Sequence, residues 1–266
     1  MNDMKFYVIP PNKHLDMMDN GDRYFCLCHH FKLDENYRNY FLNIRKNIPD
    51  AFITLDNAAA EHSLVSEEDL LWAVELLKPN EVIPPDVLFD KNQTLQNFHS
   101  FVKKMDERML FNHTSLLACP QGKTKFEWME CYINMLACPY VGCIGLSKIA
   151  VPKCWNNAID DQLIGLSRNQ CVQELLSKNL LKKPLHLLGM GEPTEFDFYL
   201  KNNISNIRSS DSCYTVLAAV NNINFEMGDT LRVKTTNEYF HYNLTQDQKD
   251  LARKNVLFLK QKFCNI

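Results

Sequence analysis

Short apolar runs recur along the chain, and polar-rich stretches with helical spacing separate them. Each run has the length and composition of a buried strand, and the interval between runs is roughly 30 residues, the size of one strand-plus-helix unit. The regular alternation predicts parallel strands joined by helices. The predicted strands span residues 24–30, 52–56, 82–86, 116–121, 143–147, 185–189 and 204–209.

The intervening stretches carry helix signals of two kinds. Ser66-Glu-Glu-Asp69 resembles a capping box, in which the first and fourth residues bond each other's backbone at the start of a helix. Further along, Phe126, Met129 and Ile133 repeat at helical spacing and predict the inner face of another helix. A terminal helix is expected over about 245–264, opening at Thr245.

The length of the chain suits eight such units. At 266 residues it matches the usual size of an eightfold barrel, so the sequence predicts a single-domain (β/α)8 TIM-type barrel over residues 1–266. An open doubly wound sheet would alternate in the same way, but it needs a glycine-rich phosphate loop after an early strand. The nearest approach is Gly189-Met-Gly191, which a tight turn explains equally well.

Composition adds few constraints. Hydrophobic residues make up 45% of the chain and charged residues 23%, as in an ordinary globular protein. No signal pattern or uninterrupted apolar stretch of about 20 residues is present, so no membrane partner and a cytoplasmic location are expected. The ten cysteines are scattered, many of them inside apolar runs, and they are predicted to be reduced. A net charge of −3 argues against a broad nucleic-acid surface but leaves room for a local basic patch.

One local cluster has the ligand types of a metal site. On a strand, Cys26, Cys28 and His30 of Cys-Leu-Cys-His-His would share one face. Structural zinc sites, however, draw their ligands from wider loops, and a packed strand explains the same residues. No metal or cofactor is therefore expected, and whether these three residues bind a metal is left open.

Five candidate site residues stand at the carboxyl ends of predicted strands. Asp56, Asp86, Gln121, Gly145 and Asp211 would all reach one rim of a barrel, where such enzymes hold their active sites. Two carboxylates in different environments can divide nucleophile and acid/base work at a glycosidic bond. The alternative for any one of these acids is that it caps the following helix.

Six short segments together resemble, in order, the active-site segments of the tRNA-guanine transglycosylases. The chain is most similar to the short phage and bacterial relatives that act on DNA, the DNA-guanine transglycosylases. Each segment is short, and the order and spacing over about 52–213 give the resemblance its specificity. The segments are Leu55–Glu61, Pro84–Asp86, Cys119–Gly122, Ile144–Ser147, Leu187–Gly191 and Ser209–Ser212.

The resemblance implies a covalent base exchange. Asp211 would attack the anomeric carbon of a guanosine, expel guanine and form a glycosyl-enzyme, which a 7-deazaguanine such as 7-cyano-7-deazaguanine then resolves. Asp56 would protonate the departing base and deprotonate the incoming one. The residues implied to bind the base are Asn57, Asp86, Gln121, Gly145, Leu146, Ser147 and Gly189.

Two departures from the family pattern bear on the substrate. The usual Gly-Gly-Phe-Gln after the first aspartate is replaced by residues 57–60, Asn-Ala-Ala-Ala, which indicates a separate branch. The zinc-binding insertion of the tRNA enzymes has no counterpart after Asp211, where only Cys213 and Cys264 remain. The resemblance therefore favours DNA over tRNA, with the guanine flipped or in a single strand.

Several alternatives stay open beside this interpretation. The same chemistry could act on tRNA or free nucleosides, or the chain could be a non-catalytic barrel subunit that binds the base. In a phage, the modified DNA would resist restriction in the host cytoplasm. The sequence leaves homodimerisation open. Basic residues that could form a local phosphate track are Lys123, Lys125, Lys148, Lys153 and Arg208.

Overall fold

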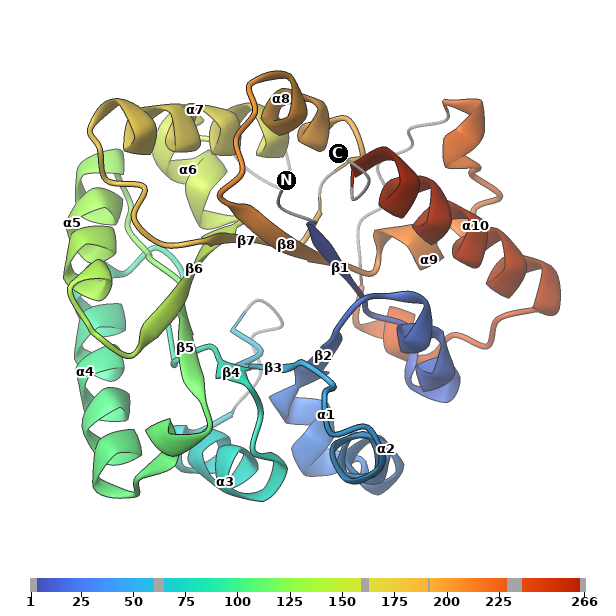
Figure 1. Ribbon diagram of the computed structural model, residues 1–266, viewed down its shortest axis with the longest axis horizontal. Coiled ribbons are helices and arrows are strands. Elements are labelled where there is room, and N and C mark those ends of the chain that lie inside the picture. Colours follow the sequence, from blue (N-terminus) through green and yellow to red (C-terminus); the bar gives the residue numbers. More distant parts are fainter. Residues whose placement is uncertain (1–3, 60–64, 159–162, 191, 229–235, 264–266) are drawn as a thin grey trace. The chain divides into compact units, whose positions relative to one another are not determined.

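A computed structural model describes residues 4–59, 65–158, 163–190, 192–228 and 236–263. Within these residues, eight parallel strands alternate with helices, which is the (β/α)8 TIM-type barrel that the sequence predicts (Figure 1). The strands form one sheet in the order β1-β8-β7-β6-β5-β4-β3-β2. Their bounds are β1 (Lys5–Val8), β2 (Tyr24–Leu27), β3 (Ile53–Asp56), β4 (Glu81–Val82), β5 (Ser115–Ala118), β6 (Val141–Ser147), β7 (Leu185–Leu188) and β8 (Ile207–Ser212).

The chain packs as two compact units, residues 24–145 and residues 1–23 with 146–266. Each unit has its own buried apolar residues and its own strand pairings. The division into two units does not test the predicted single-domain organisation, which stays a prediction. Of the residues quoted from the sequence, Ala60, Glu61, Gly191 and Cys264 lie outside the described ones.

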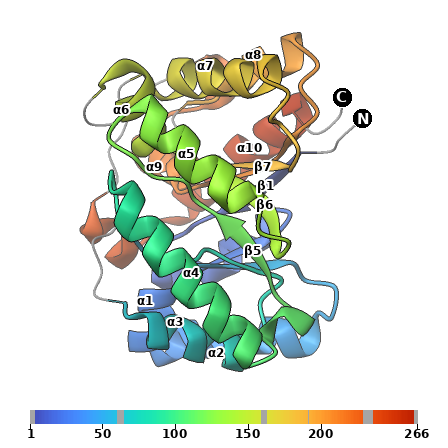
Figure 2. The ribbon, with the colours of Figure 1, turned by 90° about the vertical axis from the view of Figure 1, so that its left-hand side faces the viewer.

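In the unit of residues 24–145, helices cover β2 to β5. Ser66 and Asp69 form the predicted capping box, with Ser66 Oγ accepting from the Asp69 amide at 3.1 Å and Asp69 Oδ2 from the Ser66 amide at 3.0 Å. Figure 2 shows α4 and α5 packed side by side. The helices are α1 (Cys28–Leu33), α2 (Glu35–Asn47), α3 (Glu67–Leu77), α4 (Lys91–Glu107) and α5 (Lys125–Leu136), with a 3-10 turn η2 (Leu110–Asn112).

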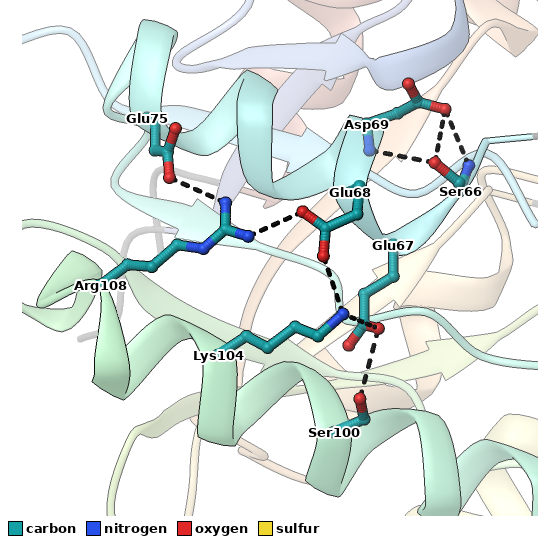
Figure 3. A network of polar contacts seen from close by, with 8 residues as sticks. All are labelled: Ser66, Glu67, Glu68, Asp69, Glu75, Ser100, Lys104 and Arg108. Carbon is teal, nitrogen blue, oxygen red and sulfur yellow. Dashed lines mark hydrogen bonds and ion pairs between the residues drawn. The ribbon is translucent and has the colours of Figure 1, made fainter.

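An ion-pair network joins α3 to α4 on the outside of this unit (Figure 3). Lys104 Nζ lies 2.9 Å from a Glu67 oxygen and 2.8 Å from a Glu68 oxygen. Arg108 reaches Glu68 at 2.7 Å and Glu75 at 2.9 Å, and the hydrogen bonds from Lys104 and Arg108 lower the pKa of Glu68. Because these charges are solvent-accessible, each pair contributes little to stability. The network links the outer faces of α3 and α4.

The other unit holds β1, β7 and β8, which lie side by side (Figure 1). β1 was not predicted from the sequence; Tyr7 pairs with Asp211 across β1 and β8. The terminal helix α10 (Gln246–Phe263) lies where a helix was expected, and Lys260 pairs with Asp22 at 2.7 Å. The remaining elements are α6 (Ala150–Asn156), α7 (Ile164–Ser177), α8 (Glu195–Lys201), α9 (Tyr214–Val220), η1 (Asn12–Asn20), η3 (Phe225–Met227) and η4 (Asn237–His241).

Four predicted strand ends were wrong by three residues or more, and one of them is β5, which ends at Ala118 instead of residue 121. β2 ends at Leu27, and Cys28 already begins α1. β4 ends at Val82, so Asp86 lies in the following loop, because Pro84-Pro85 has no N–H groups to continue a ladder. β8 runs to Ser212, which places Asp211 inside the strand instead of after it. Hydrogen-bonding partners, which the apolar pattern does not encode, decide where each strand stops.

Candidate functional site

The side-chain amides of Asn57 and Gln121 both donate hydrogen bonds to the Asp86 carboxylate. We call these three residues the Asp86 cluster. Asn57 Nδ2 donates to Asp86 Oδ1 at 2.6 Å, and Gln121 Nε2 donates to Asp86 Oδ2 at 2.5 Å. Both amides have a fixed orientation, because Asn57 Oδ1 accepts from the Ala59 amide at 2.9 Å and Gln121 Oε1 from the Phe89 amide at 3.3 Å. The structure thus brings three of the predicted base-binding residues together.

Burial dominates the electrostatics of this cluster. It raises the pKa of Asp86 to about 6, although the hydrogen bonds from Asn57 and Gln121 act in the opposite direction. Burial likewise raises the pKa of the neighbouring Cys119 thiol, whose sulfur lies 3.5 Å from Gln121 Nε2. The cluster therefore contains a carboxyl group with a pKa near 6, and the Cys119 thiol beside it stays protonated.

The raised pKa of Asp86 predicts a pH-dependent stability. A carboxyl group in an unfolded chain has a pKa of about 3.9, so the folded state holds this proton more tightly. The stabilisation is complete below about pH 4 and is lost as pH rises through about 6, with a full size of at most about 3 kcal/mol. Urea unfolding at pH 4 to 7.5 should show this loss in the wild type and not in Asp86→Asn.

Asp50→Asn provides the matched control, because Asp50 is an exposed carboxylate of the same unit. Its unfolding free energy should follow the wild-type pH dependence. Parallel curves for the wild type and Asp86→Asn would contradict the raised pKa.

Asp56, the predicted acid/base, ends β3 and pairs with Leu27 of β2. It is half-buried, and its Oδ2 accepts from the Ala58 amide at 2.8 Å. Ala58 has φ 59°, a left-handed conformation that is uncommon outside glycine. Asp56 thus closes the turn that leads to Asn57, so a local structural role is present, and its proton-transfer role stays a prediction.

Asp211 stands in a second polar cluster, formed with His186, Gly189 and Ser209, which we call the Asp211 cluster. Asp211 Oδ1 accepts from the Gly189 amide at 2.9 Å and lies 3.0 Å from His186 Nε2. The other imidazole nitrogen, Nδ1, lies 2.8 Å from Ser209 Oγ. All four residues sit on β7, β8 or the turn after β7, and the side chains of His186 and Ser209 are fully buried. The sequence pattern indicates Asp211 and Gly189 as site residues and includes Ser209 in a resembling segment without a role, but it does not indicate His186.

The turn after β7 requires glycine at position 189. Gly189 has φ +70°, and an added Cβ would lie 2.6 Å from the Lys148 side chain. The preceding carbonyl of Leu188 accepts from the Lys148 amide at 3.1 Å and from the Arg168 guanidinium. Arg168 is itself held by a fully buried ion pair with Glu195 at 3.0 Å. The Gly189 amide is therefore fixed in direction toward Asp211.

The other predicted residues contribute differently. Gly145, Leu146 and Ser147 are buried in β6, and Ser147 Oγ accepts from the Ile149 and Ala150 amides, both at 3.1 Å. The Ser147 side chain therefore starts the turn into α6. Gly145 belongs to the unit of residues 24–145, whereas Leu146 and Ser147 belong to the other unit. The predicted basic residues are exposed at 123 and 125 and half-buried at 148, 153 and 208, and a phosphate track stays a prediction.

The shared strand face proposed for Cys26, Cys28 and His30 was wrong, because Cys28 and His30 belong to α1. Burial raises the pKa of Cys26 well above its usual range and that of Cys28 to about 12, so neither is a ready thiolate ligand. Among the described residues, no group of three or more His, Cys, Asp or Glu is arranged to hold a metal. The nine cysteines in that part of the chain are all free.

Comparisons with known proteins do not identify the chain. No protein-family model matches it, and no curated protein matches it in sequence. In the part of the chain that the structure describes, no helix combines the length and apolar character needed to cross a membrane. What the protein does must be inferred from its own residues.

Proposed function

We propose that the protein is a base-exchange glycosyltransferase that replaces guanine in DNA with a 7-deazaguanine. The observation that carries the proposal is the setting of Asp211, a nearly buried carboxylate on a TIM-type strand. Both side-chain hydrogen bonds described for Asp211 engage Oδ1, which leaves Oδ2 as the attacking oxygen. A carboxylate held by one oxygen is suited to covalent catalysis at a sugar carbon.

The Asp86 cluster supports recognition of a base. A purine-like base presents N–H donors and carbonyl or ring-nitrogen acceptors along its edge, and a carboxylate beside two amides offers the complementary groups. The amide orientations are fixed by Ala59 and Phe89, so the acceptor face of Asp86 is organised before the base arrives. Preorganised polar groups favour a partner that satisfies all of them.

The proposed reaction has two displacements at the sugar. Oδ2 of Asp211 bonds to C1′ as the bond from C1′ to guanine breaks, and Asp56 gives a proton to the departing base. An incoming 7-deazaguanine then loses a proton to Asp56 and bonds to C1′, and the ester bond to Asp211 breaks. Two inversions give overall retention at C1′.

Ala58 adds a point in favour of the transglycosylase resemblance. The family pattern has glycine at the position that matches Ala58, and glycine adopts left-handed backbone freely. Here alanine has φ 59° at the matching position, so the turn after Asp56 has a conformation that suits glycine. The backbone at Ala58 is therefore compatible with the glycine of the family pattern.

Nucleoside mass analysis tests the proposal. Guanine-containing single-stranded DNA, duplex DNA and tRNA are incubated separately with the purified chain and 7-cyano-7-deazaguanine, then digested. We expect the modified deoxynucleoside from DNA alone, with an equal amount of guanine released. Modified tRNA with unmodified DNA would favour the RNA alternative, whereas base binding without exchange in any polymer would favour a non-catalytic subunit.

A further inference from the structure

Ser209, His186 and Asp211 form a continuous hydrogen-bonded chain across β7 and β8. Ser209 Oγ lies 2.8 Å from Nδ1 of His186, and Nε2 of the same ring lies 3.0 Å from Asp211 Oδ1. The ring is fully buried and packs edge-on against Tyr7 at 5.4 Å between centroids. Burying polar groups costs free energy unless each of them is hydrogen-bonded. A row of three hydrogen-bonded polar side chains in the core therefore points to a role beyond packing.

The contacts and a neutral imidazole ring together define one arrangement of the protons. An ionised Asp211 can only accept, so Nε2 of His186 must carry a hydrogen and Nδ1 must then accept in the neutral ring. Ser209 can supply that hydrogen, because its oxygen already accepts from Arg208 Nε at 3.3 Å. The chain therefore runs from Ser209 as donor, through the Nε2–H tautomer of His186, to Asp211 as final acceptor.

We propose that His186 is a positioning residue that holds Asp211 Oδ1 and assists cleavage of the glycosyl-enzyme. This inference rests on the proposed function. The Nε2–H of His186 and the amide of Gly189 converge on Oδ1, so only Oδ2 attacks. In the glycosyl ester, Oδ1 is the carbonyl oxygen. When the bond between C1′ and Oδ2 breaks, the electron pair returns to the carboxylate, and the two N–H groups stabilise the charge that reaches Oδ1.

Two substitutions separate positioning from simple packing. His186→Gln can place an amide N–H near the position of Nε2, whereas His186→Phe fills similar space against Tyr7 and donates nothing. Because His186→Phe removes the imidazole nitrogen that accepts from the Ser209 hydroxyl, it is paired with Ser209→Ala. Removing a donor of this kind lowers a rate by about 10²- to 10³-fold.

The experiment follows covalent enzyme–DNA adduct and base exchange in the same samples. We expect His186→Phe with Ser209→Ala to slow exchange about 100-fold while a larger fraction of enzyme is trapped as adduct. His186→Gln should restore most of the exchange rate and lower the adduct again. Equal loss of adduct and exchange in both variants, with unchanged thermal unfolding, would overturn the positioning role.

Nitrogen NMR of His186 distinguishes failure of the inference from failure of the proposed function. If the wild type exchanges no base in any polymer, the proposed function fails, and the imidazole signals of the intact chain still report the tautomer. An Nε2–H tautomer that changes in Asp211→Leu supports the hydrogen-bonded chain. A ring protonated at Nδ1 alone overturns the inference whatever the enzyme does.

Discussion

Replacing Asp211 by asparagine is expected to lower base exchange by roughly 10³-fold or more and to abolish the covalent enzyme–DNA adduct. An amide oxygen is too weak a nucleophile to form the glycosyl ester. The fold should survive, because asparagine keeps an Oδ1 that can accept from the Gly189 amide and His186 Nε2. Denaturing gels of labelled DNA measure the adduct, and nucleoside mass analysis measures exchange.

Asp250→Asn is the matched control for this loss. Asp250 is an aspartate on α10 of the same unit, where it pairs with Arg253 at 2.9 Å in a solvent-accessible position. Its substitution should leave adduct and exchange unchanged. A DNA adduct that persists in Asp211→Asn would mean that another residue is the nucleophile, and the proposed mechanism would be wrong.

Most strands were predictable because a parallel strand that is buried on both faces has a continuous run of apolar residues in the sequence. The run Ile53 to Leu55 and the run in β6 were located within two residues of their observed starts. β1 was missed, since Lys5–Val8 is short and its identity depends on pairing with β8, some 200 residues later in the chain. Pairing partners that distant leave no local pattern.

The inner face of α5 shows a second limit of the sequence pattern. Phe126 and Ile133 were predicted to be buried, but they are 71% and 49% exposed. The buried side instead contains Trp128 and Tyr132, whose rings stack at 5.4 Å. A helix with apolar residues on several faces does not specify its own rotation, and here the two largest side chains take the inner face.

The aspartates of the candidate site could be predicted from the sequence, but the residues that hydrogen-bond to Asp211 could not all be predicted. Asp56 and Asp86 were noticed because each interrupts an apolar run with a charge. His186 was missed, because a single histidine in an apolar run is typical of an ordinary core residue, and Ser209 was quoted only as part of a segment, without a role. The contacts of His186 lie 23 and 25 residues away in sequence, on the neighbouring strand. The signal that could have found His186 is a buried imidazole's need for two hydrogen-bond partners.

Asp86→Asn is expected to weaken binding of 7-cyano-7-deazaguanine by about 100-fold or more, because the charge-assisted acceptor for the N–H groups of the base is lost. The variant also replaces one of the two acceptor oxygens of Asp86 by an amide group that donates. Its new amide nitrogen would face an N–H of Asn57 or Gln121, and neither can rotate without abandoning the amide of Ala59 or Phe89. Titration calorimetry at pH 7.5 measures the loss.

The pH dependence of binding adds an internal check. Because burial raises the pKa of Asp86 to about 6, wild-type affinity should be constant above pH 7 and fall as the carboxylate is protonated, approaching tenfold per unit well below pH 6. Asp86→Asn should bind weakly and without this dependence, whereas Asp50→Asn should follow the wild type. An affinity that rises on acidification would show that the neutral carboxyl group is the binding form, with its own O–H as donor to an acceptor on the base.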